Sequence, residues 1–420
     1  MSGPFRTRSP RSRRRGSRRL VACTAAVVGA VAFGASAASG AQLTFRMVRV
    51  GAPNNPSVSV VPFTDAIYAS CSVAPKTKAG CVTLGSVSAD YDIGELEVTV
   101  AQYVVFLNTV DPRGTDPHNL YYSDESGPAW PKYGQINFAP RAGPGHHYSV
   151  AYPEWADKPY GFATFLRAAR FDNSLANGTV VSKRARTAGG VSYVSLTVRL
   201  STRTETGMYD LAREKSTGAT RARTRGFVIP SQNEWIKAAY YDPSGGGTLS
   251  YWKYPTNPGV FGDGTADAPA ATVLEAGTGT VTNAGTQPLA DFKPSSGPAP
   301  SWCPLQVSIT DCQTVNPFGL DPTSYELAFT GSLETVGQAR TRSPWGTLDQ
   351  GGNAVEWTDT ITAPPLGIRG GPRVWRRLHG GVANSTAYQM WLSAVGLQPQ
   401  DNVFYAHTYP WLGFRMGYIG

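Results

Sequence analysis

Turn-forming residues recur along this chain at intervals too short for long helices or long regular strands. Residues 256–285, TNPGVFGDGTADAPAATVLEAGTGTVTNAG, are dominated by Gly, Pro, Thr, Asn and Asp, and the whole chain contains 46 Gly and 32 Pro. Proline fixes φ and removes a backbone donor, whereas glycine adopts positive φ, so both residues end regular elements. The sequence therefore predicts a loop-rich domain in which helices and strands are short.

Three segments carry the start signals of helices. Thr99 with Gln102 and Ser231 with Glu234 have the spacing of capping boxes, in which each side chain bonds the backbone N–H of the other residue. The segment 160–178 has apolar residues at helical spacing, and Gly178 follows it as a stop. The apolar faces predicted for the three helices are Tyr103, Phe106 and Leu107; Phe162, Phe165, Leu166 and Ala169; and Trp235, Ala238 and Ala239.

Two apolar runs read as strands, residues 191–200 (VSYVSLTVRL) and residues 225–230 (RGFVIP). Short helices on a loop-heavy body that contains strands predict an α+β fold. No internal repeat or low-complexity linker indicates a second domain.

The N-terminus has the pattern of an export signal. Residues 1–19 contain eight arginines and no acidic residue, and an apolar run with small residues follows them. We therefore predict a signal peptide over residues 1–41 and one mature domain over residues 42–420, exported to the periplasm, the cell surface or the medium. Arg18 and Arg19 hint at the twin-arginine route, and a retained membrane anchor is the alternative.

The positive charge of the chain belongs mainly to this leader. The net charge is +9, and removal of the eight leader arginines leaves about +1, so nucleic acid is not an expected partner. The basic segment Arg213–Arg225 lacks interleaved aromatic residues, and we interpret it as a solvated loop. No later apolar run is long enough to span a membrane.

Four cysteines follow the leader in two local pairs. Cys71 and Cys81 are ten positions apart, and Cys303 and Cys312 are nine apart. In an exported chain this spacing favours two short-loop disulfides, although sequence cannot fix the connectivity.

The stretch GGNAVEWTDT, residues 351–360, combines turn residues with the side chains of a hard-oxygen metal site. Carboxylates of Asp349 and Glu356, with backbone carbonyls exposed by the glycine turn, are ligands that Ca²⁺ prefers. The alternative is a glycine turn that enters a strand, with Trp357 in the core and Glu356 paired to an arginine.

Six segments in order resemble the formylglycine-generating, or sulfatase-modifying factor, family. They are GELEVTVAQYVVFLNTV (94–110), PYGFATFLRAARFDNSLANG (159–178), GFVIPSQNEWIKAAYY (226–241), SPWGTLDQGGNAVEW (343–357), HGG (379–381) and LGFRMGY (412–418). The resemblance implies a single irregular α+β domain related to C-type lectins, with little regular secondary structure and with bound calcium. The calcium ligands implied in this chain are Asp349, Gly352, Ala354 and Glu356.

The resemblance breaks at the residues that would carry the family's oxidation chemistry. Oxidase members hold Cu(I) between two cysteines that follow the glycine pair, and those two positions here are Ser385 and Met390. A hydroxyl and a thioether do not form a dithiolate, so the sequence predicts that formylglycine generation is lost.

We therefore expect a calcium-stiffened scaffold that binds an unidentified ligand or partner. The aromatic-rich C-terminal segment borders the substrate groove in the family, and our candidate groove residues are Tyr388, Trp391, Tyr405, His407 and Trp411; core packing is the alternative for each of them. The alternative function is an O₂-dependent, non-heme iron oxidoreductase similar to the sulfoxide-synthase and pyoverdine-maturation branches. Its iron would need three of His118, His146, His147, His379 and His407 as ligands, and the spacing of these histidines matches no pattern of the family.

Overall fold

The computed structural model describes most of the chain after the predicted leader. The described residues are 40–60, 82–121, 135–211, 218–245, 250–260, 269–271, 280–284, 289–290, 333–363, 374–381, 390, 392, 396–400 and 411–420. Contacts group residues Gly40–Gly420 into one compact unit, to which all of these residues belong. The predicted leader and the four paired cysteines lie outside the described residues.

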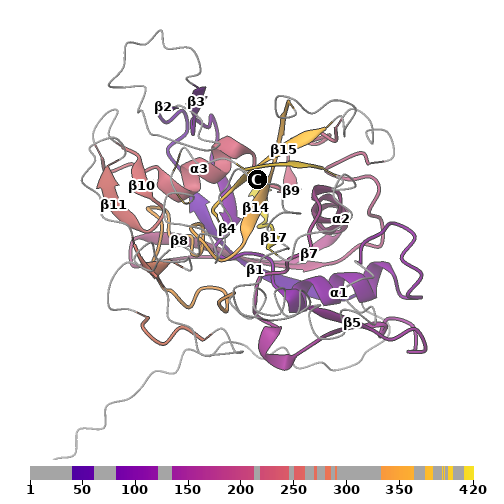
Figure 1. The fold of residues 1–420 in the computed structure, drawn as a ribbon. Coiled ribbons are helices and arrows are strands. Elements are labelled where there is room, and N and C mark those ends of the chain that lie inside the picture. Colours follow the sequence, from indigo (N-terminus) through magenta and orange to yellow (C-terminus); the bar gives the residue numbers. More distant parts are fainter. Residues whose placement is uncertain are drawn as a thin grey trace, which may run out of the picture. The chain divides into compact units, whose positions relative to one another are not determined.

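Two sheets and three α-helices form the framework in the described part (Figure 1). The larger sheet is antiparallel throughout, in the order β7 (Thr179–Ala188), β8 (Val191–Arg199), β1 (Gln42–Val50), β4 (Tyr91–Gly94), β18 (Gly417–Ile419) and β9 (Gly226–Val228). The smaller sheet has the order β16 (Gly396–Pro399), β15 (Trp375–His379), β14 (Val355–Thr362) and β17 (Leu412–Gly413). The last described strand, β18, is therefore separated from the first, β1, by β4 alone.

The remaining strands form two-stranded pairs, and the helices are short. The pairs are β2 (Val58–Val60) with β3 (Val82–Leu84), β5 (Ile136–Phe138) with β6 (Tyr148–Val150), β10 (Trp252–Tyr254) with β11 (Asn257–Val260), and β12 (Ala270–Ala271) with β13 (Leu289–Ala290). The helices are α1 (Val100–Val110), α2 (Phe165–Ala176) and α3 (Gln232–Tyr240), with the 3₁₀ turn η2 (Pro153–Trp155). This strand-rich, loop-rich arrangement agrees with the expected α+β class, whereas the relation to C-type lectins stays a prediction.

Both predicted capping boxes are present and set the starts of two helices. Thr99 accepts from the backbone N–H of Gln102 at the start of α1, and Ser231 accepts from that of Glu234 at the start of α3. The second helix begins later than the sequence pattern indicated. Phe162 has a φ of 54°, in the left-handed region, and Thr164 is the N-cap, so Phe162 is buried in the approach to the helix and not on its face.

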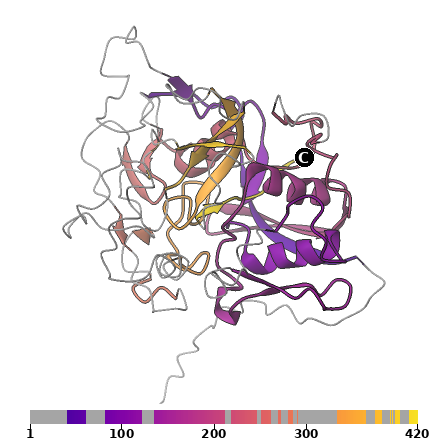
Figure 2. The same cartoon turned by 45° about the vertical axis from the view of Figure 1, so that its right-hand side comes forward.

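The alternation of apolar side chains along β1 divides the core between the two faces of the larger sheet. Leu43, Phe45 and Met47 point to one face, where they pack with α1 and α2, which lie side by side (Figure 2). Val48 and Val50 point to the other face, where they pack with Ala238 of α3. Helices thus pack against both faces of the larger sheet at β1.

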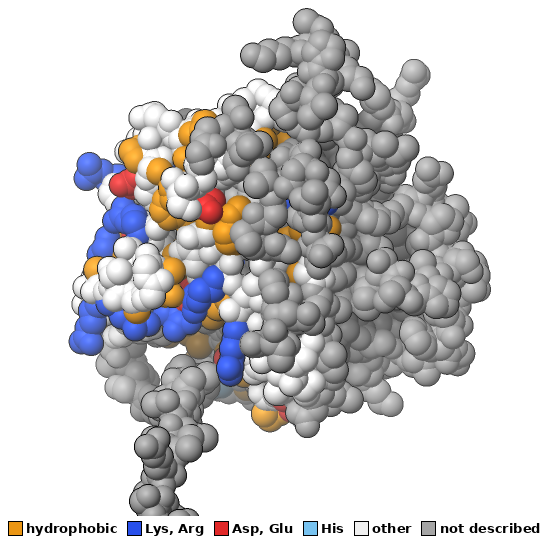
Figure 3. Space-filling model, turned by 90° about the vertical axis from the view of Figure 1, so that its left-hand side faces the viewer, with side chains coloured by type: hydrophobic (Ala, Val, Ile, Leu, Met, Phe, Trp, Pro, Cys, Tyr) orange, Lys and Arg blue, Asp and Glu red, His pale blue; other side chains and the backbone are white. Residues whose placement is uncertain are grey.

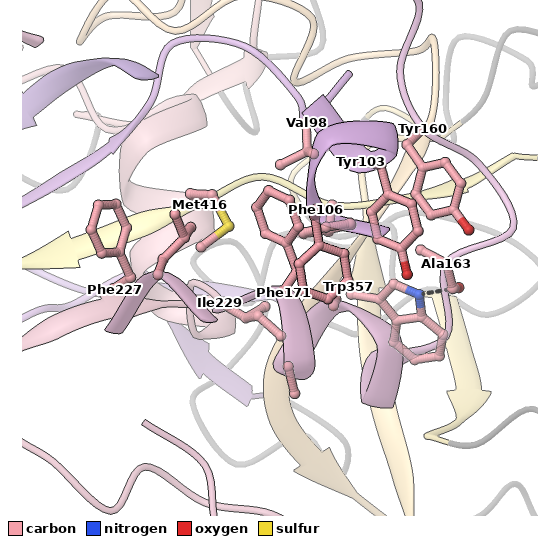
Figure 4. Close-up of a cluster of buried hydrophobic side chains, with 14 of the residues drawn as sticks. Val98, Tyr103, Phe106, Tyr160, Ala163, Phe171, Phe227, Ile229, Trp357 and Met416 are labelled. Carbon is pink, nitrogen blue, oxygen red and sulfur yellow. Dashed lines mark hydrogen bonds between the residues drawn. The ribbon is translucent and has the colours of Figure 1, made fainter. Parts of the chain in front are cut away.

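The core beneath α1 and α2 is rich in aromatic side chains (Figure 4). The rings of Tyr103 and Tyr160 stack with centroids 3.7 Å apart. Trp357 is fully buried, and its indole N–H donates to the carbonyl of Ala163 at 2.8 Å. This bond satisfies the polar group of the tryptophan and joins β14 to the start of α2.

Among the described residues, no helix has the length and apolar character needed to cross a membrane.

The basic segment Arg213–Arg225 is only partly the solvated loop that we predicted. Arg223 and Arg225 are exposed, in agreement with the prediction. Arg221, however, is mostly buried and binds Glu234 at 2.6 Å and Asp359 at 2.6 Å, so the prediction is wrong for this residue. Its partners come from α3 and β14, and a local charge pattern carries no information about them.

Candidate functional site

The GGNAVEW turn enters β14 through a tight left-handed backbone. Asp349, Gly352 and Asn353 have φ values of 57°, 87° and 57°. Asn, Asp and Gly are the residues that adopt this conformation at the least cost, so the sequence of the turn suits its geometry. The backbone N–H of Gly352 donates to the carbonyl of Gly380 at 2.7 Å, which ties the turn to the end of β15.

Glu356, the glutamate of the turn, is held by a buried arginine. Both Glu356 and Arg415 are completely buried, and the guanidinium donates to the two carboxylate oxygens at 2.6 and 2.5 Å. The indole N–H of Trp235 donates to the same carboxylate at 2.8 Å. The alternative interpretation of the turn, with Trp357 in the core and Glu356 paired to an arginine, describes the observed arrangement.

A second buried glutamate, Glu97, lies shortly before α1 in the chain and bonds the turn. It accepts from the side-chain amide of Asn353 at 3.0 Å and from the backbone N–H of Ala354 at 3.2 Å. Burial raises the pKa of Glu97 well above its ordinary value, and the charges of Asp349 and Glu356 raise it further. The Arg415 guanidinium opposes this rise only in part.

Asp349 and Glu334 bring two more carboxyl groups to the same turn. Asp349 accepts from the backbone N–H of Gly337, and the backbone N–H of Glu334 donates to the side chain of Asn353 at 3.1 Å. Burial raises the pKa of Asp349, and the neighbouring side chain of Glu334 works in the opposite direction. Since two buried carboxylates repel, this pair needs a shared proton, or a cation in its place.

The charges of this buried cluster do not balance. Glu97, Glu334, Asp349 and Glu356 are all at most 5% exposed. Arg415 bonds Glu356, and its charge also acts on Glu97 and Asp349, whereas the charge of Arg342 acts on Asp349. The predicted calcium ligands fit this environment in part. The carboxylate of Asp349 and the carbonyls of Gly352 and Ala354 are suitable oxygen donors. Glu356 fits poorly, because both of its oxygens already bind a guanidinium.

Within the described ranges, no three His, Cys, Asp or Glu side chains are grouped as they would be around a metal ion. A calcium ion here would therefore depend on main-chain carbonyls as well as carboxylates, and the calcium assignment stays a prediction.

One of the two positions that the sequence resemblance assigns to the family's cysteines is described, and it is buried. Met390 is fully buried beside the glycine turn, and a side chain added at Gly351 would meet its sulfur at 3.4 Å. The carbonyl of Met390 accepts from the hydroxyl of Tyr240 at 2.8 Å. Ser385 lies outside the described residues.

Of the predicted groove residues, the structure describes Trp411 alone. It is half-buried, packs against the main core, and its carbonyl accepts from the backbone N–H of Val355 at 3.0 Å. Tyr388, Trp391, Tyr405 and His407 lie outside the described residues, so the groove they would line stays a prediction.

The described histidines do not share one environment. His118 lies 3.3 Å from Glu205, and His147 bonds the carbonyl of Ala139 at 2.9 Å. His379 is buried and stacks on Trp235, with ring centroids 5.2 Å apart, as expected of a structural histidine. The iron alternative, which also involves His407, stays a prediction.

Sequence reasoning missed Glu97, Glu334 and Arg415 as parts of this site. Glu97 and Arg415 lie within two segments that resemble the family, GELEVTV and LGFRMGY, and a charged residue inside a mostly apolar segment was the available signal. Glu334 lies outside the recognised segments and had no comparable signal.

Comparison with known proteins yields weak similarities. No protein-family model matches the sequence, and no curated protein matches it. Among solved structures, "Treponema denticola variable protein 1" is 16% identical over 90% of this chain and 98% of its own, with a TM-score of 0.38. The crystal structure of CarF is 15% identical over 89% of this chain and 98% of its own, also with a TM-score of 0.38. Similarities at this level support no conclusion about activity, and we base none on them.

Proposed function

We propose that this chain is an exported scaffold that binds a ligand or partner and lacks formylglycine-generating activity. The observation that supports this proposal is the environment of Met390, the residue at the position of the family's second cysteine. It offers a thioether instead of a thiolate, and the side chain is enclosed by the glycine turn with no exposed surface. A substrate thiol would need an accessible copper site at this position.

The activity test uses a peptide with the CxPxR sequence that oxidase members modify. The full chain, recovered from an oxidising compartment, is incubated with this peptide, O₂ and Cu(I), and conversion of the cysteine to an aldehyde is followed by mass spectrometry. We expect no conversion. Turnover of the peptide above that of a copper-only blank would refute the proposal.

A gain-of-function variant makes this test more informative. Ser385→Cys with Met390→Cys restores the two thiols at the positions that the resemblance assigns. Thiolates bind Cu(I) tightly, so we expect this variant to retain copper through gel filtration while the natural sequence does not. Equal copper retention by both proteins would mean that the natural chain has a copper site elsewhere.

The calcium ion is a second part of the proposal and rests on the unbalanced charge around Asp349. Its carboxyl group and that of Glu334 need a shared proton or a cation, and burial excludes solvent counter-ions. We propose that calcium supplies part of this charge, with Asp349 and the carbonyls of Gly352 and Ala354 as ligands. The ion would stiffen the turn that carries β14.

Metal content and stability test this part directly. After dialysis without chelator, we expect calcium to be retained, and a chelator to lower the midpoint of thermal unfolding. At a free calcium concentration 100-fold above Kd, the ion would stabilise the fold by about 2.7 kcal/mol. Asp349→Asn should abolish the response to chelator, whereas Glu154→Gln, which changes an exposed acid on η2, should preserve it. An unchanged midpoint in the natural protein would favour the shared proton.

A further inference from the structure

Three arginines surround one tyrosine on the larger sheet, at a place that the proposed function does not use. The guanidinium carbons of Arg46 on β1, Arg186 on β7 and Arg342 lie 5.9, 5.0 and 5.7 Å from the ring centroid of Tyr193 on β8. The tyrosine is 7% exposed, whereas all three arginines are exposed. Aromatic faces attract guanidinium groups, so the ring holds these cations in one place.

The strand register explains why these side chains meet. Arg186 lies directly opposite Tyr193 in the β7–β8 pair, and Arg46 lies opposite Ser195 in the β8–β1 pair. Because side chains alternate along a strand, residues 193 and 195 share a face, and their partners share it too. At this end of the face the helix cover stops, and the neighbouring hydroxyls of Thr44 and Thr197 are 3.0 Å apart.

One carboxylate opposes the three guanidinium groups. Glu95, which is completely buried, forms ion pairs with Arg46 and, at 2.7 Å, with Arg342. Arg186 forms no ion pair with any residue that the structure describes. The site therefore has an excess of two positive charges. Burial lowers the pKa of Arg46, and the nearby charge of Arg342 lowers it further, as expected where like charges converge.

Many donors of this site remain available to a ligand. Each guanidinium has five N–H groups, and the described contacts of Arg342 use one nitrogen, which donates to Glu95 and to the carbonyl of Gly346. A space-filling view shows Lys and Arg side chains gathered along one side of the described surface, with few acidic side chains (Figure 3). Because Arg46, Arg186 and Arg342 are each exposed, donors that they do not use within the protein can face solvent.

We propose that Arg46, Arg186 and Arg342 around Tyr193 form a binding site for a phosphate or sulfate group. The planar fork of a guanidinium matches the oxygens of such groups, and two charges would neutralise the excess. The alternative is three solvated arginines that merely stack on a ring. None of the three arginines is among the proposed calcium ligands or the predicted groove residues.

Titration calorimetry with sodium sulfate and sodium phosphate tests this proposal, with sodium chloride at matched ionic strength as the blank. We expect saturable binding in the natural protein and at least tenfold weaker binding in Arg186→Gln, because an exposed arginine that bonds an anion is lost. Arg186→Lys keeps the charge but not the fork and should fall in between. Arg225→Gln, at the start of the opposite edge strand, makes the same charge change and should alter the affinity less than twofold.

The source of the group is distinguished by comparing inorganic sulfate with a sulfated disaccharide. Equal or tighter binding of the disaccharide would assign the site to an ester on a larger molecule, and weaker binding would assign it to the free ion. The proposal is overturned if sodium chloride reproduces the heat, or if Arg186→Gln and Arg225→Gln weaken binding equally. Arg186 lies on an exposed strand, so these variants should fold.

Discussion

Replacement of Arg415 by methionine is the sharpest test of the buried cluster. The guanidinium donates two bonds to Glu356 and three to the carbonyls of Gly94, Glu95 and Leu348. Methionine fills much of the volume but leaves the Glu356 carboxylate without its cation. Loss of one partner of a buried ion pair costs about 3–5 kcal/mol.

Removal of a buried cation favours protonation of the buried carboxyl groups around it, so the cost of this change depends on pH. A glutamate in an unfolded chain titrates near pH 4.3, so protonation of one buried glutamate costs about 3.7 kcal/mol at pH 7 and about 1 kcal/mol at pH 5. The destabilisation caused by Arg415→Met should therefore fall by about 2.7 kcal/mol between pH 7 and pH 5. The variant binds one more proton when folded than when unfolded across this window, so its stability decreases as pH rises.

Urea unfolding followed by tryptophan fluorescence at both pH values measures this difference. The double variant Arg415→Met with Glu356→Gln removes the charge but keeps an acceptor for Trp235, and its cost should not change with pH. Arg377→Met, at a half-buried arginine on β15, should cost about 0.5 kcal/mol at either pH. A cost for Arg415→Met that is below about 1 kcal/mol, or equal at both pH values, would show that the buried pair does not stabilise the fold.

Three further changes probe other groups. Burial raises the pKa of Asp172 well above its ordinary value, so the carboxylate form destabilises the folded protein as pH rises above about 4. Asp172→Asn should therefore stabilise the protein by on the order of 2 kcal/mol at pH 7 and have little effect at pH 4. Equal effects at both pH values would argue against a raised pKa. Burial lowers the pKa of Lys237 to about 8, so stability should rise between pH 8 and about 10.5, where only the unfolded chain holds the extra proton. Lys237→Met should remove about 2–3 kcal/mol of this rise in urea titrations, and an unchanged slope would contradict the shift. Gly190 has a φ of 80° in the β7–β8 turn with open space around it, so Gly190→Ala should cost about 1–2 kcal/mol from backbone strain alone, which thermal unfolding would detect.

The parts of the fold that could be predicted are those decided by neighbours in sequence. The capping boxes at Thr99 and Ser231 join residues three positions apart, and the alternation over residues 191–200 reflects the two faces of one strand. Phe162 was misplaced because its left-handed backbone depends on packing against the core, which helical spacing does not report. The order of the strands, with β18 between β4 and β9, likewise has no local signal.

The turn of the candidate site could be predicted from the sequence, but the charged groups around the turn could not. The residues of GGNAVEW suit a left-handed turn and a buried strand, and both are present. The number of carboxyl groups around it was not predictable, because Glu97 and Glu334 arrive from distant segments. Calcium was inferred from donor types in one stretch, whereas the fit of Glu356 depends on an arginine 59 positions later.

The ion pair between Glu356 and Arg415 links two of the segments that resemble the family. The carboxylate belongs to GGNAVEW and lies on β14. The guanidinium belongs to LGFRMGY and lies in the segment between β17 and β18. β14 pairs with β17 in the smaller sheet, and β18 lies between β4 and β9 in the larger one, so this ion pair joins the two sheets through the C-terminal segment. Removal of either partner would leave a buried charge, which is costly in any protein with this core. The roles of Glu356 and Arg415 in these two motifs are therefore explained by the architecture, and their presence is not evidence of a reaction.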